Sequence, residues 1–461
     1  AVLVAATAVP AHAAGTTIRT DAGLVSGSIS LGSSNTGQRS FQGIPFAAPP
    51  TGANRWRDPQ PVQPWHGIRQ ATEPGPRCAQ DEGFGSPASD NEDCLYLNVT
   101  TPANAVNRPV MVWIHGGSFT SGAGSDYGVD QLVRNGSVVV TINYRLGAFG
   151  YFGFPGLAGS GAFGLRDQQQ ALEWVRRNIR QFGGNPDNVT LFGASAGGLS
   201  TCAQLTTPKT QGLFHRAIIQ SGPCQLGIPA GENQVHHTWA KREDVEQAGA
   251  KAPHGCADLD CLRRLPVTEV KKLTPLFASP AYGTEALPLN PITALREGRF
   301  HHIPVLAGTT RDEMTVFVVM FYPPLDAAGY EQALTQSFGP TKAKQLLERY
   351  PAKGGDERKQ LSNVLTAVTS TWTTDELRAQ TGAYGYEFAE PKPPMIFQGM
   401  PEFDYGAYHG SELPFLLRYG TVQLTAEQQK LSRDMVDAWT RFARTGRPGW
   451  DRRDVRIFAT G

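Results

Sequence analysis

The chain has 461 residues with a formal net charge of +1, and 18% of its residues are charged. This balance excludes a basic nucleic-acid-binding footprint over the whole chain, so we expect no nucleic-acid partner. With 40% hydrophobic residues, 51 glycines and 34 prolines, the composition predicts a large core with many loops, and length alone would allow about three domains.

The N-terminus is a short apolar segment that ends in Ala11-His12-Ala13, the small-x-small pattern of a signal-peptide cleavage site. We interpret residues 1–13 as a signal-peptide remnant, the alternative being an alanine-rich disordered end, and expect a secreted, extracellular protein. No later run approaches about 18 apolar residues, so we expect no membrane anchor.

Short apolar runs followed by turn residues recur along the chain, at 109–114, 137–142, 189–192, 217–219, 303–307 and 454–458. Helical spacing lies between them, as in 172–182, and a final helix is expected to begin at a capping box formed by Thr425 and Gln428. This alternation predicts an α/β fold with a large, mostly parallel central sheet covered by helices on both faces. The charged stretches 241–272 and 341–360 are interpreted as solvated helices and insertions.

Six cysteines, Cys78, Cys94, Cys202, Cys224, Cys256 and Cys261, are an even number that an exported chain is expected to pair. Their spacing leaves 15 pairings open. The chain has no C-x-x-C pair, so we expect no metal site of that kind.

The sharpest motif is Gly193-Ala194-Ser195-Ala196-Gly197, which follows a predicted strand and precedes a predicted helix. A serine nucleophile needs to stand on such a tight strand-to-helix turn, where flanking glycines allow close packing. Ser195 is therefore the candidate nucleophile.

A serine hydroxyl needs a base and an orienting carboxylate, which follow it in the order acid and then histidine in α/β-hydrolases. His409, in a loop of small residues, is the only histidine beyond the acid candidates. Asp312 and Glu313 both follow a predicted strand, and their position does not choose between them. Amides of the glycine-rich segment 115–119 and of Ala196 are candidate oxyanion donors.

The segments 182–197 and 92–99 resemble the two long signatures of the type-B carboxylesterase/cholinesterase family of α/β-hydrolases. Shorter matches lie at 41–47, 143–147 and 220–222, and the similarity extends from about residue 17 to the end. We expect a bacterial secreted member, with 17–461 as a single α/β-hydrolase domain, because residues from Ser195 to His409 must meet at one site.

The resemblance assigns roles to individual residues. It implies Ser195 as nucleophile, Glu313 as acid and His409 as base, with oxyanion donors at the amides of Gly117, Ser118 and Ala196. It also implies disulfides Cys78–Cys94 and Cys256–Cys261, which leaves Cys202 and Cys224 as a pair by elimination.

Three departures from the family pattern bear on the substrate. Ser118 stands where the family commonly has a third glycine, and Ala194 replaces the glutamate that precedes the nucleophile in cholinesterases. The Cys78–Cys94 loop has no tryptophan, whereas a quaternary ammonium group prefers an aromatic face. The last two features disfavour a choline ester.

We therefore predict a serine carboxylesterase that hydrolyses small-molecule esters through an acyl-enzyme, without metal or organic cofactor. The alternatives are a cholinesterase- or lipase-like hydrolase on the same triad, or a non-catalytic binding member of the family. Acyl and alcohol specificity and the oligomeric state are left open by the sequence.

Overall fold

The computed structural model describes residues 15–460 apart from 31–36, 226, 230–234 and 254. The expected signal-peptide remnant, 1–13, lies outside the described residues and stays a prediction. No helix in the described part of the chain is long and apolar enough to cross a membrane.

Among the described residues, ten strands form the central sheet: β3 (Ser28–Ser30), β4 (Gln38–Pro45), β6 (Tyr96–Pro102), β7 (Arg108–Ile114), β9 (Val138–Ile142), β10 (Gly184–Ala194), β11 (Arg216–Gln220), β16 (Val305–Thr310), β17 (Tyr384–Phe388) and β19 (Val455–Phe458). Their order across the sheet is β19-β17-β16-β11-β10-β7-β9-β6-β4-β3. Pairing is parallel from β19 to β9 and antiparallel from β9 to β3. The sheet is thus mostly parallel, as predicted.

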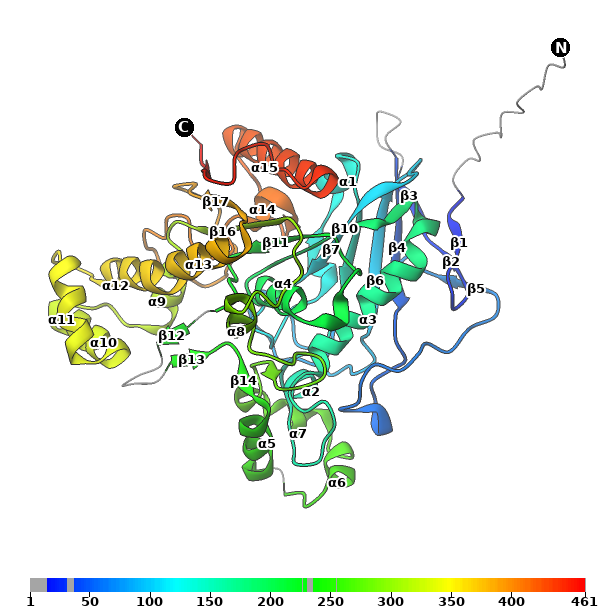
Figure 1. Cartoon of the computed structure of the whole chain (residues 1–461), viewed down its shortest axis with the longest axis horizontal. Helices are drawn as coiled ribbons and strands as arrows, with labels where there is room; N and C mark the ends of the chain where they lie inside the picture. Colours follow the sequence, from blue (N-terminus) through cyan, green and yellow to red (C-terminus); the bar gives the residue numbers. More distant parts are fainter. Residues whose placement is uncertain (1–14, 31–36, 226, 230–234, 254, 461) are drawn as a thin grey trace, which may run out of the picture.

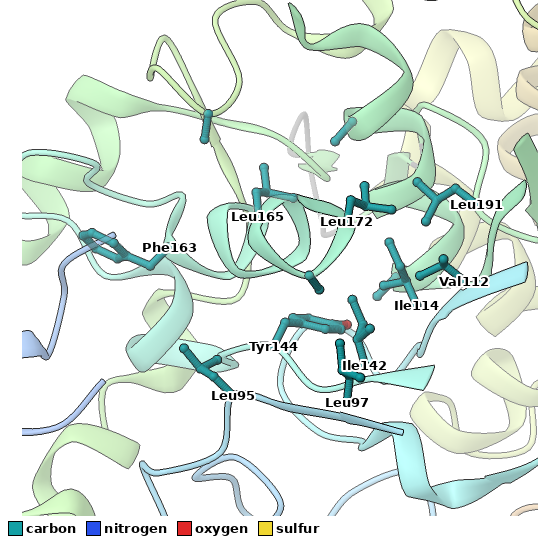
Figure 2. Close-up of a cluster of buried hydrophobic side chains, with 14 of the residues drawn as sticks. Leu95, Leu97, Val112, Ile114, Ile142, Tyr144, Phe163, Leu165, Leu172 and Leu191 are labelled. Carbon is teal, nitrogen blue, oxygen red and sulfur yellow. The ribbon is translucent and has the colours of Figure 1, made fainter. Parts of the chain in front are cut away.

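The central strands β7, β9, β11 and β16 are buried on both faces over most of their length, which explains their nearly continuous apolar runs. In β7, Val110, Val112 and Ile114 pack into one core, whereas Met111 and Trp113 point into the core on the opposite face. Figure 2 shows part of the first core, where side chains of α3 (Phe163–Asn178) lie against those of the sheet.

Helices cover both faces of the sheet. The helices α3 and α4 (Ala196–Thr206) contribute to the first core, while α15 (Ala426–Thr445) contributes Leu431, Met435 and Trp439 to the second (Figure 1). The predicted capping box of α15 is confirmed, because the Thr425 and Gln428 side chains each accept a hydrogen bond from the other residue's amide.

The boundaries of several elements differ from the sequence prediction. The strand β10 begins at Gly184, ahead of the apolar run at 189, because Gly184 already pairs with Arg108 of β7, with a register shift before Val189. The predicted helix at 172–182 is α3 followed by a 3₁₀ turn, Ile179–Phe182. The charged stretches are helical, with α5 (Arg242–Lys251) in the first and α11 (Pro340–Arg349) in the second.

The helices α9 (Thr315–Phe321), α10 (Ala327–Phe338), α11 and α12 (Arg358–Leu365) pack around a small core of their own. They form the yellow lobe to the left in Figure 1. Because α9 begins shortly after β16, this lobe lies next to the carboxyl end of the sheet, where the candidate site residues gather.

Candidate active site

Ser195 stands at the turn between β10 and α4, as its motif predicts. Its backbone has φ 57° and ψ −125°, a conformation that is costly for a residue with a side chain. The Ser195 amide donates a hydrogen bond of 2.9 Å to the carbonyl of Gln220 on the neighbouring strand β11. The surrounding sheet therefore holds the strained turn in place.

The glycines of the motif are required by close backbone contacts at this turn. A Cβ atom on Gly197 would lie 2.0 Å from the carbonyl oxygen of Ile114, and one on Gly193 would lie 2.4 Å from the carbonyl oxygen of Gly197. Gly222, in the loop after β11, is equally confined, since its Cβ would lie 2.3 Å from the Ser195 carbonyl oxygen. These contacts give the spacing of glycines around Ser195 a steric reason.

The structure distinguishes the two acid candidates. The Oε1 atom of Glu313 forms a short hydrogen bond with Nδ1 of His409. Asp312 points elsewhere: its carboxylate accepts hydrogen bonds from the Lys359 ammonium at 3.1 Å and from the Ala407 amide at 3.0 Å. Of the two candidates, Glu313 is thus the one that is hydrogen-bonded to His409.

Donors surround the second oxygen of Glu313. Its Oε2 accepts hydrogen bonds from Ser221 Oγ at 3.0 Å, Thr309 Oγ1 at 2.8 Å, the Thr310 amide at 3.0 Å and the Thr310 hydroxyl at 2.5 Å. Burial raises the pKa of Glu313, but the charge of His409 and these hydrogen bonds outweigh burial and hold it below its usual range. The carboxylate is therefore ionised next to the imidazole.

The three residues that supply these donors were missed by the sequence reasoning. Thr309 and Thr310 end β16, so their position just before the acid was a usable signal. Ser221 lies in the matched segment 220–222, but nothing in the sequence connects it with Glu313. Ser221 has a positive φ of 45°, and its hydroxyl lies beside the Glu313 carboxylate.

His409 is 7% exposed, and its ring centroid lies 4.9 Å from that of Phe317. Burial lowers the pKa of His409, but the charge of Glu313 and the hydrogen bond to it prevail, so the pKa is raised above the ordinary 6.5. Since Nδ1 is bound to Glu313, Nε2 is the ring nitrogen left for proton transfer.

The glycine-rich loop after β7 has an unusual backbone. Gly117, Ser118 and Phe119 have φ values of 105°, 55° and 62°, so three successive residues adopt conformations with positive φ. The turn is closed by the amides of Thr120 and Ser121, which donate to the carbonyl of Gly117. Ser118 adopts this conformation in spite of its Cβ atom, so the departure from the family glycine is accommodated.

The glycine-rich loop after β7 also packs tightly against the turn that carries Ser195. A Cβ atom on Gly116 would lie 2.8 Å from the carbonyl oxygen of Ala194. Ser195, His409, Gly117 and Ser118 line one pocket, whereas Ala196 begins the helix α4 directly after Ser195. The structure thus brings these sequence-predicted residues together at one edge of the sheet.

The pocket has a volume of about 600 Å³, counted together with its open mouth. Its walls are mainly apolar and aromatic, and these residues are Phe84, Tyr127, Phe317, Ile396, Phe397, Leu413 and Tyr419. Phe84 belongs to the Cys78–Cys94 loop, so that loop supplies an aromatic ring although it has no tryptophan. The Phe84 and Phe397 rings meet edge to face, with centroids 6.4 Å apart.

Within the described chain, disulfides join Cys78 to Cys94, Cys202 to Cys224 and Cys256 to Cys261. These are the three pairs expected from the sequence. The described residues contain no group of three or more histidine, cysteine or acidic side chains arranged to hold a metal ion.

A parallel sheet with a serine on a strained strand-to-helix turn, and a carboxylate–histidine pair beside it, defines an α/β-hydrolase. The model of the carboxylesterase family matches residues 14–456. The chain belongs to the carboxylesterase family, and it is a carboxylic ester hydrolase with serine carboxylesterase function.

Sequence similarity to known proteins extends over most of the chain. The chain is 34% identical to para-nitrobenzyl esterase from Bacillus subtilis (strain 168), covering 90% of this chain and 88% of the relative, and 34% identical to acylcarnitine hydrolase from Mus musculus, covering 93% and 83%. A solved structure named PNB esterase superposes with a TM-score of 0.79 at 31% identity, covering 96% of each chain.

Proposed function

We propose that Ser195 is the nucleophile of this esterase, with His409 as general base and Glu313 as the carboxylate that orients it. The observation that carries the assignment is the hydrogen bond from His409 to Glu313 in the pocket that Ser195 also lines. His409 Nε2 takes the hydroxyl proton as the Ser195 oxygen attacks the ester carbonyl. The alkoxide then leaves with that proton, and water hydrolyses the acyl-enzyme by the same route.

The developing oxyanion needs hydrogen-bond donors close to the nucleophile. We assign this role to the amides of Gly117, Ser118 and Ala196. The positive φ values of Gly117 and Ser118 turn the loop at the pocket wall, and Ala196 occupies the first position of α4, where an amide has no acceptor within the helix. The N-terminal end of that helix also favours negative charge.

The residues that line the pocket indicate the class of ester that the enzyme accepts. The aromatic and aliphatic side chains that line the pocket, among them Phe84 and Tyr419, favour uncharged esters with an apolar or aromatic part. The names of relatives such as para-nitrobenzyl esterase agree with this class. We also propose that the enzyme acts outside the cytoplasm, because three disulfides are typical of proteins in oxidising compartments.

Hydrolysis of short-chain p-nitrophenyl esters tests the assignment. We expect turnover by the wild type and labelling by a fluorophosphonate, both abolished in Ser195→Ala, with kcat reduced by about 10⁴-fold or more. Ser125→Ala, at an exposed serine, is the matched control and should behave like the wild type. Full activity of Ser195→Ala would refute the assignment, and a wild type that neither turns over nor is labelled would favour a binding role.

A further inference from the structure

Gln80, two residues after Cys78, is a buried glutamine that joins the Cys78–Cys94 loop to the glycine-rich loop after β7. Its Oε1 accepts a hydrogen bond of 2.8 Å from the Gly122 amide, and its Nε2 donates to the carbonyl oxygens of Gly122 at 3.0 Å and Cys78 at 2.9 Å. The residue is 2% exposed. Both N–H groups and the oxygen of its side chain are therefore paired, and the side chain is fixed in one orientation.

Both hydrogen bonds from Gln80 to the glycine-rich loop fall on one residue, Gly122, and hold its N–H and its C=O together. Gly122 has φ 116°, in the region that favours glycine. A Cβ atom on it would lie 2.4 Å from Nδ1 of His115 and 2.8 Å from the carbonyl oxygen of Gly116. The backbone that Gln80 fixes therefore lies directly against the start of the same loop.

The His115 ring in turn holds the first peptide group of the loop. Its Nδ1 lies 2.8 Å from the carbonyl oxygen of Gly116, and because that oxygen can only accept, Nδ1 carries the ring proton. The C=O of Gly116 and the N–H of Gly117 belong to one planar trans peptide group and point in opposite directions. The ring therefore directs the Gly117 amide away from itself.

The next peptide group is held in a similar way. The Gly117 carbonyl accepts hydrogen bonds of 2.9 Å from the Thr120 amide and 3.0 Å from the Ser121 amide, so the Ser118 amide points to the opposite side. The amides of Gly117 and Ser118 have no acceptor in the described part of the chain, and both residues line the pocket. Since Gly122 directly follows Ser121, the residue that Gln80 holds closes the turn that orients these two amides.

We propose that Gln80 is a positioning residue that keeps the amides of Gly117 and Ser118 where the oxyanion develops. This inference rests on the proposed function of Ser195 and on the oxyanion donors assigned with it. Gln80 does not line the pocket, so it acts only through Gly122 and the turn that Gly122 closes. Without its side chain, the N–H and C=O of the buried Gly122 lose their partners, and the turn shifts to find others.

Gln80→Met tests the proposal in the full-length protein, because methionine fills a similar volume but pairs with neither polar group of Gly122. We expect kcat for p-nitrophenyl butyrate to fall by about 10- to 100-fold, since a displaced oxyanion donor costs less than a removed one. KM is expected to stay within about threefold of wild type, because the disulfide and the backbone pairing of residue 80 with Ser89 still hold the loop that carries Phe84.

Gln169→Met is the matched control. Gln169 on α3 is also buried, at 1% exposure, and its side chain also makes three hydrogen bonds, with Arg166, Gln204 and Ala286, but it does not line the pocket. We expect this variant to lose stability as Gln80→Met does and to keep kcat within about twofold of wild type. An equal loss of kcat in both variants would overturn the proposal, because the loss would then follow from stability alone.

Inhibition by a trifluoromethyl ketone measures the oxyanion site separately from ground-state binding. The Ser195 oxygen bonds to the carbonyl carbon, the hydroxyl proton passes to His409, and the carbonyl oxygen becomes an oxyanion that needs the amides. We expect the inhibition constant to rise by about 10- to 100-fold in Gln80→Met and to stay at the wild-type value in Gln169→Met. An unchanged inhibition constant in Gln80→Met would overturn the role of Gln80.

Two further variants complete the series. Gln80→Glu keeps the acceptor for the Gly122 amide but loses the donor to its carbonyl, so it is expected to change kcat and the inhibition constant in the same directions as Gln80→Met, and wild-type values would overturn the proposal. Ser195→Ala separates the two claims. If it is inactive while Gln80→Met matches wild type, only the role of Gln80 is overturned. If it keeps its activity, the proposed function fails, and the role of Gln80 fails with it.

Discussion

Exchanging Glu313 for glutamine is the most informative perturbation of the site, because only one of its two oxygens can be kept. Four donors from three residues converge on Oε2, namely Ser221 Oγ, Thr309 Oγ1, and the amide and the hydroxyl of Thr310. The carbonyl oxygen of the glutamine must stay among them to avoid leaving these donors unpaired, so its NH₂ group is turned toward His409. The ring then has to accept at Nδ1 and carry its proton on Nε2, where it cannot take the proton of Ser195.

This wrong tautomer, together with the lost negative charge, is expected to lower kcat by about 10³–10⁴-fold, or about 4–5.5 kcal/mol of transition-state stabilisation. KM should change little, because Glu313 lies behind His409 and does not line the pocket. Initial rates over a range of p-nitrophenyl butyrate concentrations measure both quantities.

The matched control is Asp312→Asn, at the acid candidate that the sequence could not exclude. Asp312 is bound to Lys359 and to the Ala407 amide, so kcat of this variant should remain within a few-fold of wild type. Retention of more than a tenth of kcat by Glu313→Gln would refute the tautomer argument. An equally large loss in Asp312→Asn would show that the carboxylates had been assigned wrongly.

Three further predictions concern pH and stability. Because the neighbouring carboxylate raises the pKa of His409 above 6.5, kcat/KM should fall on acidification with a midpoint above pH 6.5, and a lower midpoint in the pH–rate profile would contradict this. Replacing both cysteines of the Cys202–Cys224 bridge by alanine should lower the free energy of unfolding by roughly 3 kcal/mol, since their separation is 22 residues; identical denaturation midpoints would argue against it. Asp167→Asn should cost about 3–5 kcal/mol in chemical denaturation, because it leaves the buried Arg145 guanidinium without the carboxylate that now accepts hydrogen bonds of 2.8 and 2.7 Å.

Much of the fold was predictable because it depends on local patterns. Strands buried on both faces require apolar runs, a helix with one buried side requires apolar residues three and four apart, and a capping box specifies where α15 begins. The glycine pattern around Ser195, the predicted nucleophile, has a similarly local origin, since Cβ atoms on Gly193 and Gly197 would meet backbone atoms within or next to one turn.

The neighbours of Glu313 and the role of Phe84 could not be predicted in this way. Ser221 and Glu313 are 92 residues apart, and they meet because β11 and β16 are adjacent in the sheet. Phe84 reaches the pocket from a disulfide-bonded loop that precedes most of the strands of the sheet. No pattern of composition or spacing encodes which strands become neighbours.

The sequence by itself determined the class of fold and the family resemblance, and it singled out Ser195 and His409 as candidates, because short segments carry each of these patterns in full. Only the tertiary structure shows that Glu313, and not Asp312, is hydrogen-bonded to His409, and which side chains donate to that carboxylate. Hydrogen bonds and charge coupling act over a few ångströms in space, whatever the separation along the chain. They therefore become visible only when the order of the strands is known.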